Sequence, residues 1–347
     1  MIKIGLRLVD ASREHLQRAA QIGVDGGTLR IGLLPGVAEH GAPDPTALRE
    51  LLASFDALGL QLGGMELQRL FITGVLRGDI DRGEQELEVV TETIRVLGDH
   101  GIDLVTCGFS VAHADEHEQG WRGYADEPNG RAGTLLRAFD ATRLVEEDLV
   151  TWGAAEPGAE GVLVSETEVW RRLDFFMQRV LPVAREAGVR LAFHPSDPPL
   201  PLYRGVQQPF TNPDGLQRLL DRYDEPNVGL LFCLGTMQES GADMPAALRR
   251  FGEAGKLFAI HFRNVRGTVP RFEEVFQDEG DYDTVAQMRT LHEVRFDGFV
   301  MPDHYPGLLG DSEARDTARA WCVGYLRALA QATGPASTPT SVSHTSA

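Results

Sequence analysis

Residues 228–261 read VGLLFCLGTMQESGADMPAALRRFGEAGKLFAIH, and this stretch holds the structural unit on which the fold prediction rests. Two short apolar runs, Val228–Phe232 and Leu257–His261, flank the helix-length amphipathic stretch Met244–Glu253. Each run is only a few residues long and is bounded by turn residues or a polar segment, as is usual for buried strands of a parallel sheet. The stretch therefore predicts one strand–helix–strand unit.

The same unit recurs along the chain. The expected strands are short apolar runs, namely Ile2–Leu8, Gly27–Ile31, Gln61–Leu67, Ile102–Cys107, Val189–Phe193, Val228–Phe232, Leu257–His261 and Gly298–Met301. The expected helices are amphipathic stretches, namely Arg13–Gln21, Asp44–Leu58, Arg82–His100, Glu166–Ala187, a segment capped by Asn212, Met244–Glu253, Asp281–Val294 and Ser312–Gln331. Such a series fits a closed parallel barrel or a doubly wound sheet, and eight units favour the barrel. We predict an α/β protein with a single (β/α)8 TIM barrel.

Two segments fall outside this pattern. Gly108–Gly161 is a long loop after the fourth strand, rich in Gly, Asp, Glu and Arg, and in a barrel it would lie over the active-site end as a lid. Within it, we expect Leu135–Trp152 to be helical. Residues 334–347 are rich in Ser, Thr and Pro, which predicts a disordered tail after a catalytic barrel domain of residues 1–333.

The charge balance restricts the partners. The 347 residues include 51 acidic and 33 basic side chains, which gives a formal net charge of −18. A field of this sign repels phosphate backbones and anionic membranes, so we expect neither a nucleic acid nor a membrane as partner. An anionic substrate would need local positive charge from a metal ion or from arginines.

The cysteines and the N-terminus indicate a reducing compartment. Cys107, Cys233 and Cys322 are far apart and odd in number, so no disulfide framework is expected. No apolar run approaches the length of about 18 residues that a membrane span requires. Ile2–Leu8 opens directly as a strand pattern without the zones of a signal peptide. We expect a cytoplasmic protein.

Four candidate metal ligands stand at the ends of consecutive expected strands. They are His194, Cys233, His261 and, just after the last strand, Asp303. The carboxyl ends of barrel strands form one mouth, where active sites of this fold lie, and neighbouring strands are only about 5 Å apart. Imidazole, thiolate and carboxylate all bind metals, so the sequence predicts one divalent ion. Mixed N, S and O donors suit Mn2+, Fe2+, Co2+ or Zn2+ better than Mg2+ or Ca2+.

Five motifs around these ligands resemble the mannonate dehydratase family. In chain order they are HPSDPP (His194–Pro199), FCLGT (Phe232–Thr236), HFRNV (His261–Val265), FEEVFQDEGD (Phe272–Asp281) and PDH (Pro302–His304). The resemblance is strong from about Arg190 to His304 and weak in the first half of the chain. It implies a metal-dependent hydro-lyase with a xylose isomerase-like barrel, which converts D-mannonate to 2-keto-3-deoxy-D-gluconate and water. It also implies Mn2+ or Fe2+ as the ion that the four ligands hold.

Further roles are expected for residues beside the ligands. His304 is expected to be the acid/base residue, because imidazole groups titrate near neutral pH, and Tyr305 is a second catalytic candidate. Asp197 is expected to orient His194. The candidates for binding the substrate are polar residues near the ligand strands, namely Arg204, Arg263 and Asn264. We expect a small-molecule sugar acid as the substrate and a homo-oligomer as the assembly.

The chain departs from the family pattern at four places. Met301 replaces the arginine before Pro-Asp-His, Ser196 replaces the first aspartate of the H-P-D-D loop, and Tyr305 replaces a glycine. The family also has a tyrosine near the start of the last helix, and Glu313–Thr317 offers none. These departures leave two alternatives open, which are a metal-dependent sugar isomerase or epimerase and a non-catalytic metal- or sugar-binding relative.

Overall fold

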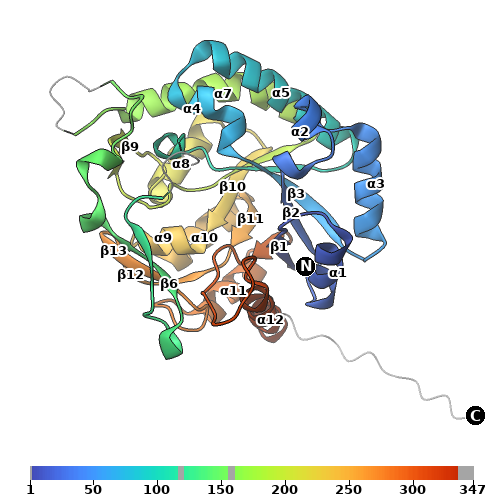
Figure 1. Cartoon of the computed structure of the whole chain (residues 1–347), viewed down its shortest axis with the longest axis vertical. Helices are drawn as coiled ribbons and strands as arrows, with labels where there is room; N and C mark the ends of the chain where they lie inside the picture. The colour runs from blue at the N-terminus through green and yellow to red at the C-terminus, as the bar shows by residue number, and fades with distance from the viewer. Residues whose placement is uncertain (1, 116–120, 155–160, 335–347) are drawn as a thin grey trace, which may run out of the picture.

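The computed structural model describes residues 2–115, 121–154 and 161–334. Eight parallel strands close into a barrel in the order β1-β14-β11-β10-β7-β4-β3-β2, with helices around the outside (Figure 1). The barrel strands are β1 (Lys3–Arg7), β2 (Gly26–Arg30), β3 (Gln61–Leu67), β4 (Leu104–Cys107), β7 (Arg190–Phe193), β10 (Val228–Cys233), β11 (Leu257–His261) and β14 (Phe299–Met301). The predicted (β/α)8 barrel is confirmed, and every predicted strand begins and ends within two residues of an observed one.

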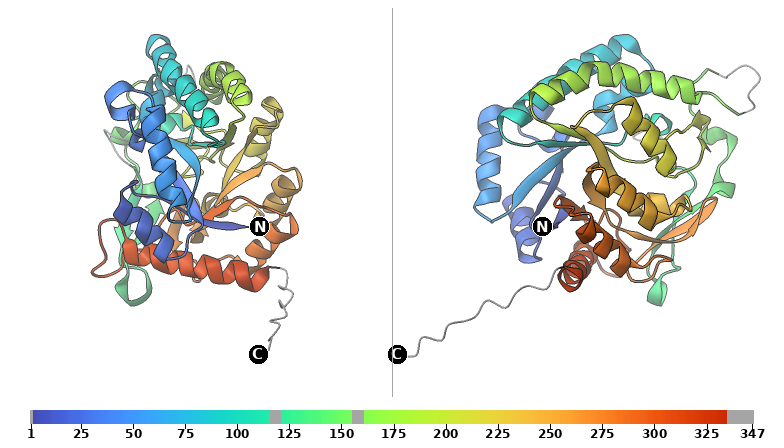
Figure 2. Two further views of the ribbon diagram at one scale, coloured as in Figure 1. Left: turned by 90° about the vertical axis from the view of Figure 1, so that its right-hand side faces the viewer. Right: turned by 180° about the vertical axis from the view of Figure 1, so that it is seen from behind.

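The helices form the outer ring, which Figure 2 shows from two further sides. They are α1 (Arg13–Gln21), α2 (Val37–His40), α3 (Pro45–Asp56), α4 (Thr73–Arg77), α5 (Ile80–Asp99), α7 (Glu166–Glu186), α8 (Pro213–Arg222), α9 (Leu234–Glu239), α10 (Met244–Glu253), α11 (Thr284–Glu293) and α12 (Asp316–Thr333). All the predicted helices between strands are present, and Asp44 and Asn212 cap α3 and α8 through their side chains as expected. Among the described residues, none of these helices is both long and apolar enough to cross a membrane.

The segment expected as one long loop contributes two strands to a second sheet. In spatial order this sheet consists of β12 (Asn264–Thr268), β13 (Arg271–Val275), β6 (Leu136–Asp140) and β5 (Tyr124–Glu127). Figure 1 shows β6 in the same region as β12 and β13, and β6 pairs with β13 although the two strands are far apart in the sequence. The prediction that Leu135–Trp152 is helical is wrong, because antiparallel pairing with β13 satisfies the backbone of β6 and buries Phe139 against Phe272. A two-stranded sheet of β8 (Leu202–Tyr203) and β9 (Val206–Gln207) follows β7. The tail expected at 334–347 lies outside the described residues except for its first position.

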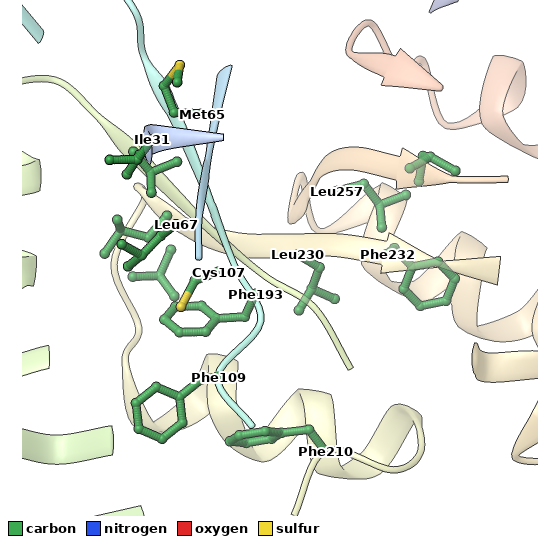
Figure 3. Packing of buried hydrophobic residues seen from close by; sticks show 14 of the residues in the cluster. Ile31, Met65, Leu67, Cys107, Phe109, Phe193, Phe210, Leu230, Phe232 and Leu257 are labelled. Atoms are coloured by element: carbon green, nitrogen blue, oxygen red, sulfur yellow. The ribbon is translucent and has the colours of Figure 1, made fainter. Parts of the chain in front are cut away.

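Two apolar layers hold the barrel together. The larger one lies between the strands and the helices, where Phe193 packs near Cys107 and Phe109 (Figure 3). A smaller layer consists of Leu104, Ala192, Leu231, Phe258, Ala259, Phe299 and Met301. On β7 and β14, successive side chains point to opposite faces, so Ala192, Phe299 and Met301 alternate with residues of the larger layer, namely Leu191, Phe193 and Val300. A Cβ atom at Gly63 would lie only 2.1 Å from the ring of Phe299. This position of β3 therefore requires glycine.

Candidate metal centre and substrate pocket

The four predicted ligands converge at the carboxyl end of the barrel. One ligand atom each from His194, Cys233, His261 and Asp303 can be chosen so that all lie within 4.8 Å of one another. Each ligand stands two residues beyond a member of the small apolar layer, namely Ala192, Leu231, Ala259 and Met301. The strand register strengthens this arrangement, because Cys233 pairs with His261 across β10 and β11. The alternation that places apolar side chains inside the barrel therefore aims these four donors at one point above them.

The donor set fits a divalent cation. Nδ1 of His261 and Oδ1 of Asp303 are buried and have no hydrogen-bond partner among the described residues, and such unpaired polar atoms are costly unless a ligand engages them. Nδ1 of His194 lies 2.7 Å from the carbonyl oxygen of Pro195, which leaves Nε2 to bind a metal. Burial lowers the pKa of His194, and it lowers the pKa of His261 to about 3, so both imidazoles are neutral, as metal ligands must be.

Cys233 and Asp303 supply the anionic donors. Sγ of Cys233 lies 3.8 Å from Oδ2 of Asp303 and accepts a hydrogen bond from the backbone N–H of Thr236 at 3.5 Å. Burial raises the pKa of the Cys233 thiol. Burial also opposes ionisation of Asp303, but Arg263 and the neighbouring histidines hold its pKa well below the ordinary value. A bound divalent ion would favour the Cys233 thiolate, so these two residues would bring two negative charges to the ion.

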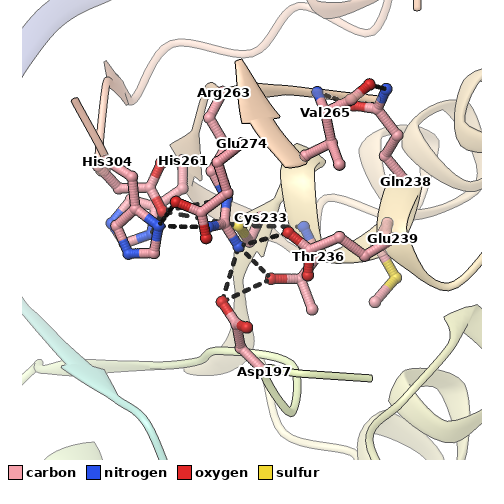
Figure 4. Close-up of polar contacts among 12 residues, drawn as sticks. Asp197, Cys233, Thr236, Gln238, Glu239, His261, Arg263, Val265, Glu274 and His304 are labelled. Atoms are coloured by element: carbon pink, nitrogen blue, oxygen red, sulfur yellow. Dashed lines mark hydrogen bonds and ion pairs between the residues drawn. The ribbon is translucent and has the colours of Figure 1, made fainter. Parts of the chain in front are cut away.

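Arg263 lies at the centre of a buried ion network, which Figure 4 shows. Its guanidinium donates to Oε1 of Glu274 at 2.6 Å and to Oδ2 of Asp197 at 2.7 Å, and it lies 3.0 Å from Oε1 of Glu239. Only 2% of the side chain is exposed, and it does not line the pocket beside the ligands. The donors of Arg263 are directed at carboxylates inside the protein, and its binding of substrate stays a prediction.

Two other predicted substrate-binding residues, Arg204 and Asn264, make buried contacts within the protein. The guanidinium of Arg204 pairs with Asp115 at 2.6 Å, both side chains are fully buried, and neither lines the pocket. The side-chain amide of Asn264 donates to the carbonyl oxygens of Gln277 and Tyr282 and accepts from Gln238. These side chains join segments of the chain, and their binding of substrate stays a prediction.

Asp197 has a different role from the expected one. Its Oδ1 accepts a hydrogen bond of 2.6 Å from the hydroxyl of Tyr124, and its Oδ2 pairs with Arg263. Burial opposes its ionisation, but Arg263 and the other neighbours hold its pKa far below the ordinary value. The carbonyl of Pro195, rather than Asp197, orients the imidazole of His194. Asp197 instead ties β5 to the ion network.

His304 and Tyr305 follow the last ligand and border the pockets. Nδ1 of His304 lies 2.6 Å from Oε2 of Glu274 and also contacts Arg263, and its side chain is 26% exposed. The hydroxyl of Tyr305 donates to the carbonyl of Pro302 at 2.8 Å, and burial raises the pKa of Tyr305 to about 12. His304 is therefore positioned to act on a bound molecule, whereas the hydroxyl of Tyr305 is engaged within the protein.

The opposite wall of the pocket comes from the first half of the barrel, which the sequence reasoning left almost unassigned. Its residues include Arg7, Thr28, Arg30, Glu66, Arg69, Thr106 and Trp121. A second pocket lies beside the first and shares Arg7, Arg30, Asp303 and His304 with it. Arg7 and Arg30 are the last residues of their strands, and Glu66 is the penultimate residue of β3. The strand-end rule that identified the metal ligands could therefore have identified these residues too.

The (β/α)8 fold and the mixed nitrogen, sulfur and oxygen donors at its mouth place this chain in the class of (β/α)8 barrels with a candidate metal site at the carboxyl end of the strands. Residues 160–337 match the family model described as D-mannonate dehydratase (UxuA). Mannonate dehydratase 2 of Halalkalibacterium halodurans is 38% identical over 245 residues, which are 64% of this chain and 67% of that protein. The mannonate dehydratase of Thermotoga maritima is 32% identical over 145 residues, which are 41% of this chain and only 40% of that protein. The chain belongs to the mannonate dehydratase family.

A solved structure extends the likeness of fold over nearly the whole chain. The mannonate dehydratase from Streptococcus suis serotype 2 superposes with a TM-score of 0.78 and 23% sequence identity. The superposition covers 96% of this chain and 95% of that one, so the two proteins have the same fold. The family-model match contains all four ligand candidates and His304 but stops short of Arg7, Arg30 and Glu66.

Proposed function

We propose that this protein is a hydro-lyase that converts D-mannonate to 2-keto-3-deoxy-D-gluconate and water, with one divalent ion held by His194, Cys233, His261 and Asp303. The observation that carries the proposal is the convergence of these four donors beside the partly exposed imidazole of His304, in a chain of the mannonate dehydratase family. The mixed donor set favours Mn2+ or Fe2+, with Co2+ or Zn2+ as substitutes.

The reaction requires proton transfer and charge stabilisation. The C2–H bond and the C3–O bond of the substrate break, a C2–C3 double bond forms, and the resulting enol becomes the 2-keto group. When bound, the ion supplies Lewis-acid stabilisation of the negative charge that develops beside the substrate carboxylate. The protein itself must take a proton from C2 and give one to the departing hydroxyl, with one side chain or with two.

His304 is the residue that we assign to proton transfer. Because the carboxylate of Glu274 holds Nδ1, the other ring nitrogen is left to act on the substrate. A single imidazole that takes the C2 proton can deliver it to the departing hydroxyl, so the protons balance without a second group. A single residue in both roles would explain how the reaction proceeds without a tyrosine in Glu313–Thr317. Tyr305 does not replace that tyrosine in this scheme, because its hydroxyl donates a hydrogen bond to the carbonyl of Pro302.

The direct test is to assay purified protein with D-mannonate and Mn2+. We expect a 2-keto-3-deoxy acid, identified by NMR and by a carbonyl-specific assay, and no product after the metal is removed by chelation. Isomerisation of a neutral sugar without turnover of D-mannonate would instead support a sugar isomerase or epimerase. Binding of metal and sugar acid without any product would support a non-catalytic relative.

The assembly and the location are separate proposals. We propose that the chain forms a homo-oligomer, which light scattering coupled to size-exclusion chromatography would test. A monomeric mass at micromolar concentration would contradict it. The cytoplasmic location expected from the sequence stays a prediction.

A further inference from the structure

Two guanidinium groups face the pockets with their hydrogen-bonding capacity unused. Arg7 and Arg30 line both pockets, and their side chains are 35% and 45% exposed. Across the described ranges of the chain, their one acidic neighbour within 4 Å is Glu66. Its Oε2 lies 3.7 Å from Nη1 of Arg7 and 3.8 Å from Nε of Arg30. Both separations are longer than a hydrogen bond.

Two other arginines of the second pocket already donate hydrogen bonds within the protein, and a third is packed against aromatic rings. Arg315 donates to the carbonyl of Tyr305 at 2.9 Å, and Arg319 donates to two backbone carbonyls. Arg137 differs from these two, because its Nε has no hydrogen-bond partner among the described residues, but its guanidinium lies over the rings of Tyr124 and Trp121 at 4.3 and 4.9 Å. Arg7 and Arg30 therefore differ from Arg315 and Arg319, whose donors are used within the protein, and from Arg137, whose guanidinium is covered by aromatic rings.

Glu66 occupies the position of an internal counter-ion. Its Oε2 is buried, lies close to both guanidinium groups and has no hydrogen-bond partner among the described residues. A carboxylate oxygen in this position attracts the two arginines without satisfying their N–H groups. It would hold the pair together in the free protein, and an anion that entered the pocket would compete with it.

The charge of the metal centre makes such a pair necessary. The Cys233 thiolate and the Asp303 carboxylate together carry two negative charges, which cancel the charge of a divalent ion. The chain as a whole carries a formal charge of −18, so its long-range field repels an anion. A sugar acid therefore needs positive charge from elsewhere in the pocket. Arg7 and Arg30 are pocket arginines that have neither a hydrogen-bond acceptor nor an aromatic ring against their guanidinium groups among the described residues.

We propose that Arg7 and Arg30 form a subsite that binds the carboxylate of a sugar acid, and that Glu66 positions both guanidinium groups and competes with the ligand. The inference rests on the proposed function in taking a sugar acid as the ligand. It goes further because it identifies the residues that would distinguish acidic from neutral sugars, which are Arg7 at the end of β1 and Arg30 at the end of β2. Guanidinium groups suit this role because their planar arrays of N–H donors match a carboxylate.

The test is isothermal titration calorimetry of the Mn2+-loaded protein with D-mannonate, and with D-mannitol as a neutral analogue. Arg7→Gln and Arg30→Gln are each expected to weaken D-mannonate binding about tenfold or more, because each removes charge-assisted hydrogen bonds. Binding of D-mannitol and the metal content are expected to stay unchanged. Arg49→Gln, on the exposed surface of α3, removes the same charge outside the pockets and is expected to bind D-mannonate like the wild type.

The third variant, Glu66→Gln, is expected to change the affinity for D-mannonate in the opposite direction. Glu66→Gln removes the competing charge and is expected to tighten D-mannonate binding about threefold. Thermal unfolding would confirm that each variant is folded, and Arg7→Lys, which retains the charge, is expected to recover part of the affinity. Wild-type affinity in both arginine variants would overturn the subsite. Loss of turnover in Glu66→Gln without tighter binding would overturn the role given to Glu66.

The subsite and the proposed function can fail separately. If D-mannonate binds through Arg7 and Arg30 but gives no product, the dehydratase proposal fails and the subsite stands. If every variant dehydrates D-mannonate with the wild-type KM, the subsite fails and the dehydratase proposal stands. If the wild type binds neither D-mannonate nor any other aldonate of a stereoisomer panel, both fail.

Discussion

The two halves of the barrel place different chemistry at the same mouth. The strands β7, β10, β11 and β14 deliver imidazole, thiol and carboxylate groups, whereas β1, β2 and β3 deliver two guanidinium groups and a carboxylate. The donors of the second half are well buried, with side-chain exposures of 16% for His261 and 7% for Asp303. Arg7 and Arg30 are more than twice as exposed as His261. In our proposals, the buried second half holds a cation, and the more exposed first half binds a ligand that arrives from solvent.

The two halves also differ in how far the family model matches them. The family-model match covers residues 160–337, which include the whole metal-binding half and exclude β1 to β4. We interpret the second half as the part that determines the type of reaction. The first half is then the part where the substrate is selected.

The largest effect is expected from breaking the metal-binding half. His261→Ala removes a ligand and leaves Asp303 with fewer partners, so we expect loss of bound metal and a fall in activity of about a thousandfold or more. Elemental analysis of the purified variant and an assay with D-mannonate would measure both. His40→Ala, at an exposed histidine of α2, is the matched control. Full metal occupancy in His261→Ala would remove His261 from the ligand set.

The next effect separates proton transfer from metal binding. His304→Gln keeps the size and polarity of the side chain but removes the titrating ring, so we expect kcat to fall by about a hundredfold to ten-thousandfold. The metal content and KM should change little, because His304 is not one of the four ligands. Steady-state kinetics with parallel metal analysis would decide. A variant that retains kcat would show that another group moves the proton.

A third prediction concerns the ion network behind the ligands. Burial opposes ionisation of Glu274, but His304 and Arg263 hold its pKa below the ordinary 4.5. Its carboxylate therefore stabilises the fold above about pH 4.5, and this contribution is lost as the pH falls below that value. We expect Glu274→Gln to cost about 2 kcal/mol of unfolding free energy at pH 7, and less at pH 4. Urea unfolding of metal-free protein would measure the gap, and an equal gap at both pH values would contradict the prediction.

The smallest effect is expected where the two halves meet. Met301 stands on β14, next to β1, at the position where the family pattern has arginine, and it packs in the small apolar layer at 1% exposure. Met301→Leu nearly conserves the volume, so we expect a stability change below about 1.5 kcal/mol and activity within about twofold. A large loss of activity would indicate that the thioether acts on the substrate rather than only filling space.

The parts that the sequence predicted correctly depend on local patterns. Alternation and turn residues located the eight barrel strands, and the strand-end rule located four donors that do converge. The rule depends only on the alternation of side chains between the two faces of a strand, so it does not require knowing which residues lie nearby in space. It was applied to the second half, where the family motifs drew attention, and not to Arg7 and Arg30.

The contacts that the sequence did not predict depend on partners distant in the sequence. Arg204 is explained by Asp115, and Arg263 by Glu274, Glu239 and Asp197, and no local pattern links these residues. Strand β6 exists because β13 lies beside it, so local helix propensity was overridden by tertiary pairing. An arginine next to a candidate site can bind substrate or satisfy a buried carboxylate, and the three-dimensional structure is needed to distinguish the two.

The most direct measurement is an anomalous diffraction map of crystals grown with Mn2+. We predict one strong peak about 2.0–2.4 Å from Sγ of Cys233, a carboxylate oxygen of Asp303 and one ring nitrogen each of His194 and His261. A peak bound elsewhere, or one that leaves Cys233 and Asp303 without contact to the ion, would contradict the account.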